Sequence, residues 1–294
     1  MLVLGKKIYS VYKTKGIIET VSIIVKRIFK QKPKSLPLIK EIVSHGKGIE
    51  IGGPSTIFQS SNILPIYPYI EKLDNCNFQN NTLWNSNLKE GYSYKYHPSK
   101  VDGYQFIQDS VDLAQIESES YEFLLSSHVL EHIANPIKAL EEWKRILKVD
   151  GHLILLVPHK DGTFDHKRPT TTLKHLIHDY KNDIKEDDLT HLEEILQFHD
   201  LLRDPEAGSY ENFKKRSYDN YQNRSLHHHA FTTLSLAELI DYIQLKIVAI
   251  EPIDPMHIMI VAQKLSTNID VKNDALLSSL KMPSFKSPFY SDRL

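Results

Sequence analysis

The chain has 294 residues and a formal net charge of −1, and its 41% of hydrophobic and 25% of charged residues are typical of a globular protein. Its single cysteine, Cys76, excludes an internal disulfide framework, and no apolar run is long enough to span a bilayer. The amino terminus also lacks a secretory signal pattern, so we expect a cytoplasmic protein.

The amino-terminal segment differs in charge from the rest of the chain. Residues 1–40 contain ten Lys or Arg and one acid, so their net charge is +9 and that of the remainder is −10. Apolar residues recur at helical spacing between the lysines of residues 6–29, which predicts a basic amphipathic helix within residues 1–34. Such a helix packs on the acidic body, the interpretation that we favour, or associates weakly with an anionic membrane surface.

A short apolar run at residues 48–51 is followed by two glycines, Gly52 and Gly53. The run predicts a buried parallel strand, and glycines after it let the backbone turn tightly beside a ligand. In an open α/β sheet this turn lies at the carboxyl edge, where cofactors bind. Glu50 is then placed to accept hydrogen bonds from a ligand, although an ordinary strand-to-helix turn has the same pattern.

Alternating strands and crossovers follow this turn. The predicted strands are residues 70–74, 104–109, 121–127 and 152–158, with one or two helices at residues 128–147. The first of these strands ends in Asp74, which follows Gly52 by 22 positions, close to the spacing of a ribose-binding acid. We expect helices in the crossovers, and therefore a parallel, doubly wound sheet.

The carboxyl-terminal part of the core contains a predicted helix at residues 235–243 and strands at residues 246–250 and 258–262. The two strands are too close for a helix between them, which predicts an antiparallel pair at the sheet edge. The fold class is therefore α/β, a Rossmann-like sheet that is mostly parallel with an antiparallel edge strand.

A histidine-rich segment interrupts the alternation. Residues 159–230 contain nine histidines and many acids, and a long insertion after a strand's carboxyl end would stand over the cofactor crevice. The predicted organisation is a core of residues 35–158 and 231–264, this helical or irregular insertion over the active site, and a weakly ordered tail at residues 265–294.

Several separate segments resemble the class I S-adenosylmethionine-dependent methyltransferases. Residues 50–53 (EIGG) are similar to that family's acidic glycine loop. Residues 126–151 (SSHVLEHIANPIKALEEWKRILKVDG) are similar to the family's sequence motif around the fourth strand and the following helix. The resemblance implies S-adenosyl-L-methionine as the methyl donor and S-adenosyl-L-homocysteine as the product. The cofactor-binding residues that it implies are Glu50, Gly52, Gly53, Asp74, Asp109, Ser110 and Ser127.

The glycine loop departs from the family's pattern. Pro54 replaces the second loop glycine and Thr56 the third, and proline cannot adopt a left-handed turn, so the backbone path must differ. A nicotinamide-binding G-x-G-x-x-G would need glycines where Pro54 and Ile57 stand, which argues against a dehydrogenase.

Methyl transfer from a sulfonium is an in-line displacement, so its main requirement is that donor and acceptor are held close and aligned. A hydroxyl acceptor must also lose a proton, a demand that is smaller for an amine. His128 and His159 both follow strand carboxyl ends that face the crevice, and each is a candidate general base. Each could equally be a local cap, and His128 a cofactor neighbour, whereas His132 is expected to pack structurally.

Residues 163–169 (TFDHKRP) are a candidate substrate-binding segment, with His166 and Arg168 as its contacts. Arg168 could hold a phosphate or carboxylate through two parallel hydrogen bonds. A solvated loop would have the same composition.

The histidines also suggest a metal. His191, His199, Asp200 and residues 227–229 could supply ligands, but their spacing matches no zinc signature and there is no thiol partner. Consecutive histidines also point in different directions. We therefore expect no bound metal, and a solvated or pH-sensitive cluster instead.

Together these observations predict an S-adenosylmethionine-dependent methyltransferase acting on a small polar acceptor, such as a hydroxyl of a sugar or glycan precursor. Nucleic acid is not expected as a partner, because the acidic body would repel phosphate. The alternative is a catalytically silent protein on the same fold that binds a nucleoside cofactor or another protein.

Overall fold

The computed structural model describes residues 32–293. The predicted basic helix at residues 6–29, and with it the expectation of a membrane-surface contact, lies outside the described residues.

Eight strands form one sheet in the described part of the chain, in the order β3-β4-β2-β1-β5-β6-β8-β7. The strands are β1 (Lys47–Ile51), β2 (Lys72–Asn77), β3 (Gly91–Tyr94), β4 (Gly103–Ile107), β5 (Tyr121–Ser127), β6 (Leu147–Pro158), β7 (Lys246–Ile253) and β8 (His257–Gln263). The strands from β4 to β6 pair in parallel, while β8 and β7 form the predicted antiparallel edge. The fold class is confirmed, with a further antiparallel strand, β3, that the sequence did not indicate.

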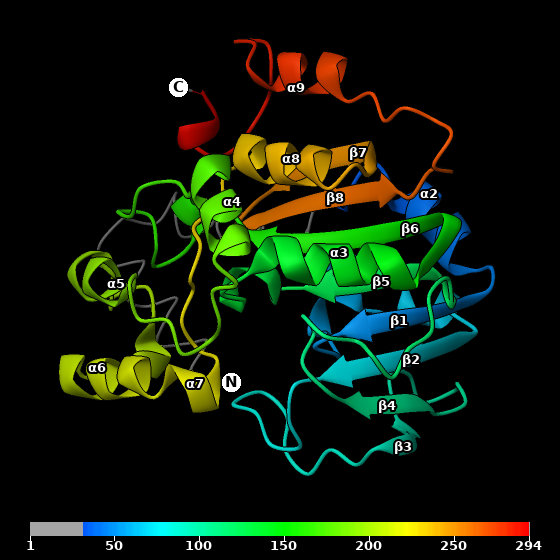
Figure 1. Ribbon diagram of the computed structural model, residues 1–294, viewed down its shortest axis with the longest axis horizontal. Coiled ribbons are helices and arrows are strands. Elements are labelled where there is room, and N and C mark those ends of the chain that lie inside the picture. The colour runs from blue at the N-terminus through cyan, green and yellow to red at the C-terminus, as the bar shows by residue number, and fades with distance from the viewer. Residues whose placement is uncertain (1–31, 294) are drawn as a thin grey trace, which may run out of the picture.

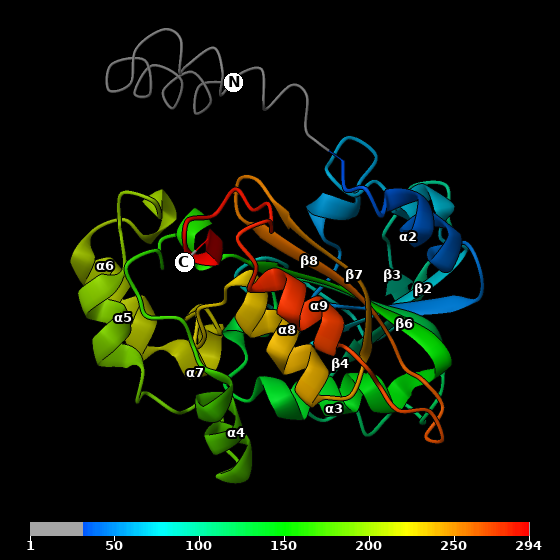
Figure 2. The same cartoon turned by 90° about the horizontal axis from the view of Figure 1, so that it is seen from above.

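Helices cover both faces of this sheet. The α-helices are α2 (Leu36–Val43), α3 (Pro136–Ile146), α4 (Leu173–Lys181), α5 (Leu192–Phe198), α6 (Tyr210–Tyr218), α7 (Asn220–Asn223), α8 (Thr233–Tyr242) and α9 (Asp274–Leu280). Helices α3, α8 and α9 lie on one face and α2 on the other (Figure 2). Neighbouring side chains of β5 and β6 therefore point into two separate cores, as the period of a strand requires.

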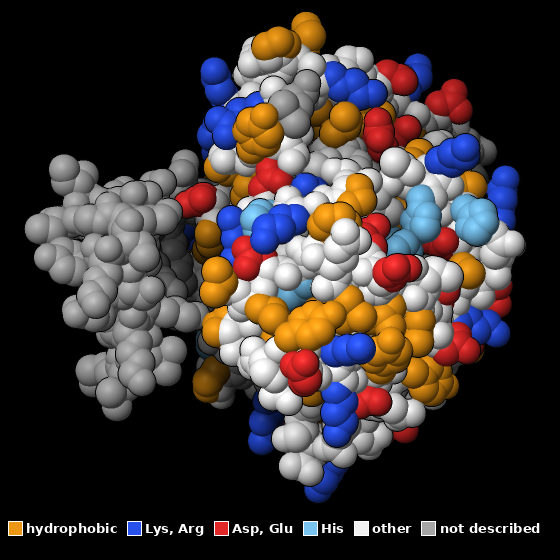
Figure 3. Space-filling model, turned by 90° about the vertical axis from the view of Figure 1, so that its left-hand side faces the viewer, with side chains coloured by type: hydrophobic (Ala, Val, Ile, Leu, Met, Phe, Trp, Pro, Cys, Tyr) orange, Lys and Arg blue, Asp and Glu red, His pale blue; other side chains and the backbone are white. Residues whose placement is uncertain are grey.

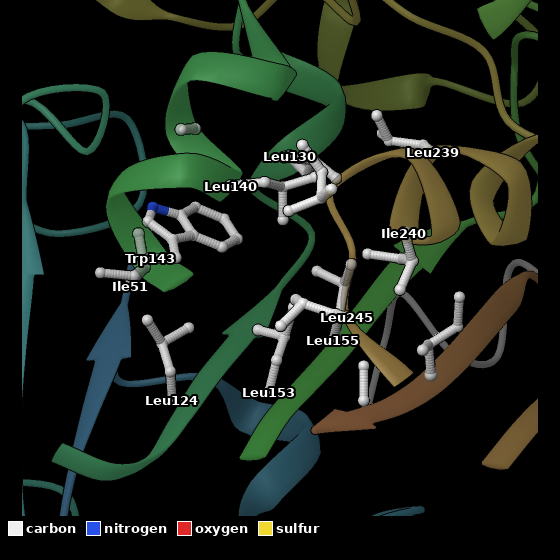
Figure 4. Packing of buried hydrophobic residues seen from close by; sticks show 14 of the residues in the cluster. Ile51, Leu124, Leu130, Leu140, Trp143, Leu153, Leu155, Leu239, Ile240 and Leu245 are labelled. Atoms are coloured by element: carbon white, nitrogen blue, oxygen red, sulfur yellow. The ribbon is translucent and has the colours of Figure 1, made fainter. Parts of the chain in front are cut away.

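The larger core lies between the sheet and helices α3 and α8. Leu124 of β5 and Leu153 of β6 point toward Trp143 of α3 and Ile240 of α8 (Figure 4). Helix α3 begins where the sequence indicates, because the side chain of Asn135 caps it and accepts a hydrogen bond from the Lys138 amide at 3.1 Å.

The helical crossovers are fewer than predicted. Between β1 and β2 the chain contains only the 3₁₀ turns η1 (Thr56–Phe58) and η2 (Tyr67–Tyr69), and β2 is followed by a loop and β3. Pro54, Pro65 and Pro68 explain the first of these differences, because proline interrupts the hydrogen bonds of a regular helix. Among the described residues, α3 is the one α-helix that joins two parallel strands directly.

Two further expectations need correction. Strand β2 begins and ends later than predicted, so Asp74 lies in the middle of the strand, opposite Ile49 of β1. The tail from residue 265 is not weakly ordered as a whole, because it contains α9 and the 3₁₀ turn η6 (Ser291–Arg293). Leu280 and Phe289 of this tail are buried.

The insertion after β6 carries α4 to α7, which lie beyond the carboxyl ends of the parallel strands (Figure 1). It has a small apolar cluster of its own, formed by Leu192, Ile195, Ala207, Phe213 and Leu226. None of the helices found between residues 32 and 293 combines the length and hydropathy needed to cross a bilayer.

Replacing Trp143 by alanine is expected to lower the free energy of unfolding by about 3–5 kcal/mol, measured by urea denaturation. The indole is fully buried, and its Nε1–H donates to the Ser110 carbonyl at 3.0 Å. Trp84→Ala is the matched control, because Trp84 is 58% exposed, and its effect should stay within about 0.5 kcal/mol. Equal effects of the two substitutions would contradict this account of the core.

Candidate active site

A large open cleft lies at the carboxyl ends of the parallel strands, with a volume of ≈ 2680 Å³. Residues that follow β1, β2, β4 and β5 line it, together with parts of the insertion and the tail. Figure 3 views this end of the molecule, where histidine side chains lie among apolar and charged ones. Small-molecule sites typically measure about 300–1,000 Å³, so the cleft has room for two ligands side by side.

The turn after β1 forms one wall of the cleft. Gly52 lines it and has a φ of +82°, a left-handed conformation that favours glycine. A Cβ at this position would also approach a methyl group of Val129 to 2.5 Å. Gly53 lies behind the wall, where its amide donates to the Asn75 side chain at 2.9 Å.

Glu50 supports this turn from beneath and does not line the cleft. Its buried carboxylate accepts hydrogen bonds from the Ser55 amide at 3.0 Å, the Tyr67 hydroxyl at 2.8 Å and the Tyr94 hydroxyl at 2.6 Å. Burial raises the pKa of Glu50 despite these three donors. The acid of the glycine motif therefore fixes the path of the loop.

Asp74 is not at the cleft, contrary to the ribose-binding role that the resemblance implies. Its carboxylate accepts hydrogen bonds from the Tyr104 amide at 2.9 Å and the Tyr121 hydroxyl at 2.8 Å, and pairs with Lys47 at 2.5 Å. The reason is that β2 continues for three residues beyond Asp74. Asn77, at the end of the strand, lines the cleft in its place.

Three other implied cofactor contacts do line the cleft, namely Asp109, Ser110 and Ser127. Asp109 is held by Arg224 of the insertion, whose Nη2 lies 3.0 Å from its Oδ2. Arg224 also pairs with Glu186 at 3.0 Å. This contact could not be predicted from the sequence, because Arg224 lies 115 residues further along the chain than Asp109.

His128 lines the cleft directly after Ser127. Its φ is +56°, and its amide donates to the Leu156 carbonyl at 2.9 Å, which fixes the residue to the end of β6. The ring Nε2 is 2.9 Å from Nδ1 of His257. Burial, with the neighbouring His257 and His227, lowers the pKa of His128 to about 3, so the ring is neutral near pH 7.

A buried acid lies beside His128. Glu131 is 1% exposed, neither carboxylate oxygen has a hydrogen-bond partner among the described residues, and burial raises its pKa to about 7. Nδ1 of His128 and Nε2 of His132 each lie 3.8 Å from its Oε1, and Nε2 of His227 lies 4.0 Å away. His132, which we expected to pack structurally, also lines the cleft.

In His132 and His227, the ring nitrogen on the side away from Glu131 also has a polar neighbour. Nδ1 of His132 lies 3.0 Å from the Leu226 carbonyl, and Nδ1 of His227 lies 2.5 Å from Oδ2 of Asp165. Burial lowers the pKa of His132, whereas Asp165 outweighs burial and raises the pKa of His227. The same pairing affects Asp165. Burial alone would raise the pKa of Asp165, but the neighbouring His227 and Arg168 hold this pKa below its usual range.

His159, the second candidate base, does not line the cleft, contrary to the prediction. The ring is fully buried, Nδ1 accepts a hydrogen bond from the Asp161 amide at 3.2 Å, and Nε2 lies 3.1 Å from Asp292. The ring also stacks on Phe289 with centroids 4.0 Å apart. The tail thus covers His159, which explains why its position after a strand was misleading.

The predicted substrate contacts are occupied by the protein itself. Arg168 is 2% exposed, and it donates to Asp165 at 3.0 Å and to the carbonyls of His227 and His228 at 2.7 and 3.1 Å. Nε2 of His166 lies 2.9 Å from Asp200. Neither His166 nor Arg168 lines the cleft, so both predictions are corrected.

The residues that the sequence suggests as possible metal ligands do not lie together in the structure. His199 pairs with Asp204 at 3.2 Å and Asp200 with His166, whereas His191 lies beside His229 in another part of the insertion. Of residues 227–229, His227 lies beside Glu131, His228 contacts Asn220 and Glu186 at 3.0 and 3.5 Å, and His229 lies beside His191.

Comparison with known proteins finds one family model that matches part of the chain. Residues 83–155 match the model of a methyltransferase domain, a stretch that runs from before β3 into β6 and contains His128 and Glu131. No curated protein sequence matches the chain.

Solved structures of methyltransferases are similar to the chain at low identity. A protein from Methanosarcina mazei described as a SAM-dependent methyltransferase shares 15% identity, over 78% of this chain and 97% of that one, with a TM-score of 0.46. An S-adenosylmethionine-dependent methyltransferase from Mesorhizobium loti shares 10% identity over 78% and 95%, with a TM-score of 0.45. A SAM-dependent methyltransferase from Aquifex aeolicus shares 10% over 82% and 98%, with a TM-score of 0.41.

The matched domain contains the segment on which the sequence resemblance rests, residues 126–151, and it folds into the strand, helix and strand that the resemblance implies. The sheet is of the Rossmann-like type, with a left-handed glycine turn at the cleft. The match to a methyltransferase domain over residues 83–155 and the Rossmann-like sheet together support the resemblance found in the sequence.

Proposed function

We propose that the protein transfers a methyl group from S-adenosylmethionine to a hydroxyl group of a small polar acceptor, such as a sugar or glycan precursor. The observation that supports the proposal is the position of His128, an imidazole that lines the cleft beside the buried Glu131. A hydroxyl acceptor needs such a proton acceptor, and an amine needs it less.

The residues at the strand ends fit an adenosyl cofactor. Gly52 lines the cleft, and its lack of a Cβ lets the turn pack against the methyl group of Val129 that would lie 2.5 Å from such an atom. Asp109 and Ser110 line the same cleft and could bind the adenine, and we assign the ribose contact to Asn77 in place of Asp74. When bound, the sulfonium supplies an electrophilic methyl carbon, whose bond to sulfur breaks as the bond to oxygen forms.

The protein's own contribution is to orient the acceptor and receive its proton. His128 follows the end of β5, where its amide is hydrogen-bonded to the Leu156 carbonyl and its ring Nε2 lies 2.9 Å from Nδ1 of His257, so the ring has a defined position at the cleft. The carboxyl group of Glu131, 3.8 Å from Nδ1, would stabilise the imidazolium that forms. We assign the insertion, residues 159–230, to acceptor binding, because Arg203 and Arg224 from it line the same cleft.

The cofactor assignment can be tested by calorimetry with S-adenosylmethionine. Asn77→Ala is expected to raise Kd about tenfold, because it removes a hydrogen-bonding group from the cleft wall. Asp74→Asn is the matched control, since Asp74 does not line the cleft, and it should leave Kd unchanged. A loss of affinity in the Asp74 variant alone would contradict this assignment.

The proton acceptor can be tested by following release of S-adenosylhomocysteine with a panel of monosaccharides and nucleotide sugars, and a second panel of amines. Turnover is expected with hydroxyl acceptors, and His128→Asn should lower kcat by about 10²–10⁴-fold while leaving cofactor affinity unchanged. His45→Asn is the control, because His45 is exposed just before β1, at the opposite edge of the sheet.

Turnover restricted to amines would refute the hydroxyl assignment. Cofactor binding without turnover on either panel would favour the catalytically silent alternative.

A further inference from the structure

We propose that the insertion contains a binding site for a divalent transition-metal ion, zinc by its ligand set, formed by His175, Asp179, His191 and His229. The site is separate from the cleft, because none of these four residues lines it. The proposal reverses our expectation from the sequence that no metal binds.

The four side chains converge on one point. One ligand atom from each residue lies within 4.8 Å of all the others. Nε2 of His175 is 3.0 Å from Nε2 of His191 and 3.1 Å from Oδ2 of Asp179. Ligands of a tetrahedral zinc ion with bonds of 2.0–2.1 Å lie about 3.3 Å apart, so these spacings suit a shared ion with small adjustments.

Two of the converging atoms are buried without a hydrogen-bond partner among the described residues. They are Nδ1 of His229 and Oδ2 of Asp179, whose contact with His175 at 3.1 Å lacks the geometry of a hydrogen bond. His229 is 1% and Asp179 5% exposed. Leaving a buried polar atom unpaired is costly, and such atoms call for an explanation. An ion at the centre would be bound by both.

The tautomer of His229 is set for metal binding by the other side of its ring. Nε2 lies 3.2 Å from the carbonyl oxygen of Ala134, so this nitrogen carries the proton and donates it. Nδ1 then has a free lone pair, on a ring that lies beside those of His175 and His191. A backbone carbonyl holding the outer N–H is the usual support of a metal-binding histidine.

The ligand types favour zinc over the common hard cations. Three imidazoles and one carboxylate are typical of zinc and its transition-metal neighbours, whereas calcium and magnesium prefer oxygen ligands. Four protein ligands would also fill a tetrahedral shell, which is the pattern of structural rather than catalytic zinc.

The arrangement has one competing explanation without a metal. A protonated His175 could pair with Asp179 and donate to His191, which would account for the two shortest distances. This explanation leaves Nδ1 of His229 unpaired, although the ring of His229 lies 6.0 Å from that of His175 and 5.6 Å from that of His191. The metal accounts for all four side chains together.

The ion would fasten three separate segments of the insertion together. His175 and Asp179 are on one face of α4, His191 directly precedes α5, and His229 lies in the stretch that leads to α8. These ligands are also attached to the core, because the ring of His229 contacts the carbonyl of Ala134, just before α3. Metal binding should therefore stabilise the insertion against the core.

The test uses the full-length protein, stripped with a chelator and then titrated with Zn²⁺ or Co²⁺. After gel filtration we expect bound zinc in a fixed ratio to protein by elemental mass spectrometry, a higher Tm, and a visible Co²⁺ spectrum of tetrahedral type. Asp179→Ala, His229→Gln and His191→Gln should each lose one equivalent of zinc and the cobalt spectrum.

His178→Gln is the matched control. His178 is on the same helix next to Asp179, its side chain is 69% exposed, and it is not one of the proposed ligands, so its variant should keep the ion. If a buried variant does not fold, the wild-type cobalt spectrum and the variant of the partly exposed His191 still decide the question.

Failure of wild-type protein to retain zinc, or a cobalt spectrum without tetrahedral character, would overturn the proposal. Unchanged zinc content in all three ligand variants would overturn it as well, because the ion would then be bound elsewhere, for example at Glu131, His132 and His227. None of these outcomes depends on methyl transfer, so the proposal and the proposed function can fail independently.

Discussion

The buried guanidinium group of Arg168 holds the three consecutive histidines in place. It donates to the carbonyl oxygens of His227 and His228 and to the carboxylate of Asp165. A buried charge must be paired in this way, because its uncompensated desolvation costs several kcal/mol. With the backbone fixed, the ring of His227 lies beside Glu131 at the cleft, and the ring of His229 is part of the proposed metal site.

The cleft and the proposed metal site are physically connected through the start of α3. The amide of His229 donates to the Glu131 carbonyl at 3.4 Å, and its ring contacts the Ala134 carbonyl. Glu131 and His132 are in the short 3₁₀ turn before this helix, beside the cleft. Order in the insertion therefore contributes to the position of the groups that we assign to proton transfer.

Much of the fold could be predicted from local patterns. The apolar runs of β5 and β6, a helix within residues 128–147 and the closely spaced final strands all appear where the sequence indicates. The misses have physical reasons. Prolines suppress the first crossover helix, and β2 continues past its acid, which moves Asp74 away from the cleft. The tail has an unremarkable polar composition, yet it covers His159.

The sequence alone determined the type of sheet and one side of the site, because strand periodicity and the glycine turn place Gly52, Ser127 and His128 at the carboxyl edge whatever else surrounds them. Only the tertiary structure decided which polar groups meet. Arg168 became an internal anchor, and His175 came to lie beside His229, 54 positions later in the sequence. Such contacts follow from the packing of the insertion on the core, and spacing along the chain carries no information about it.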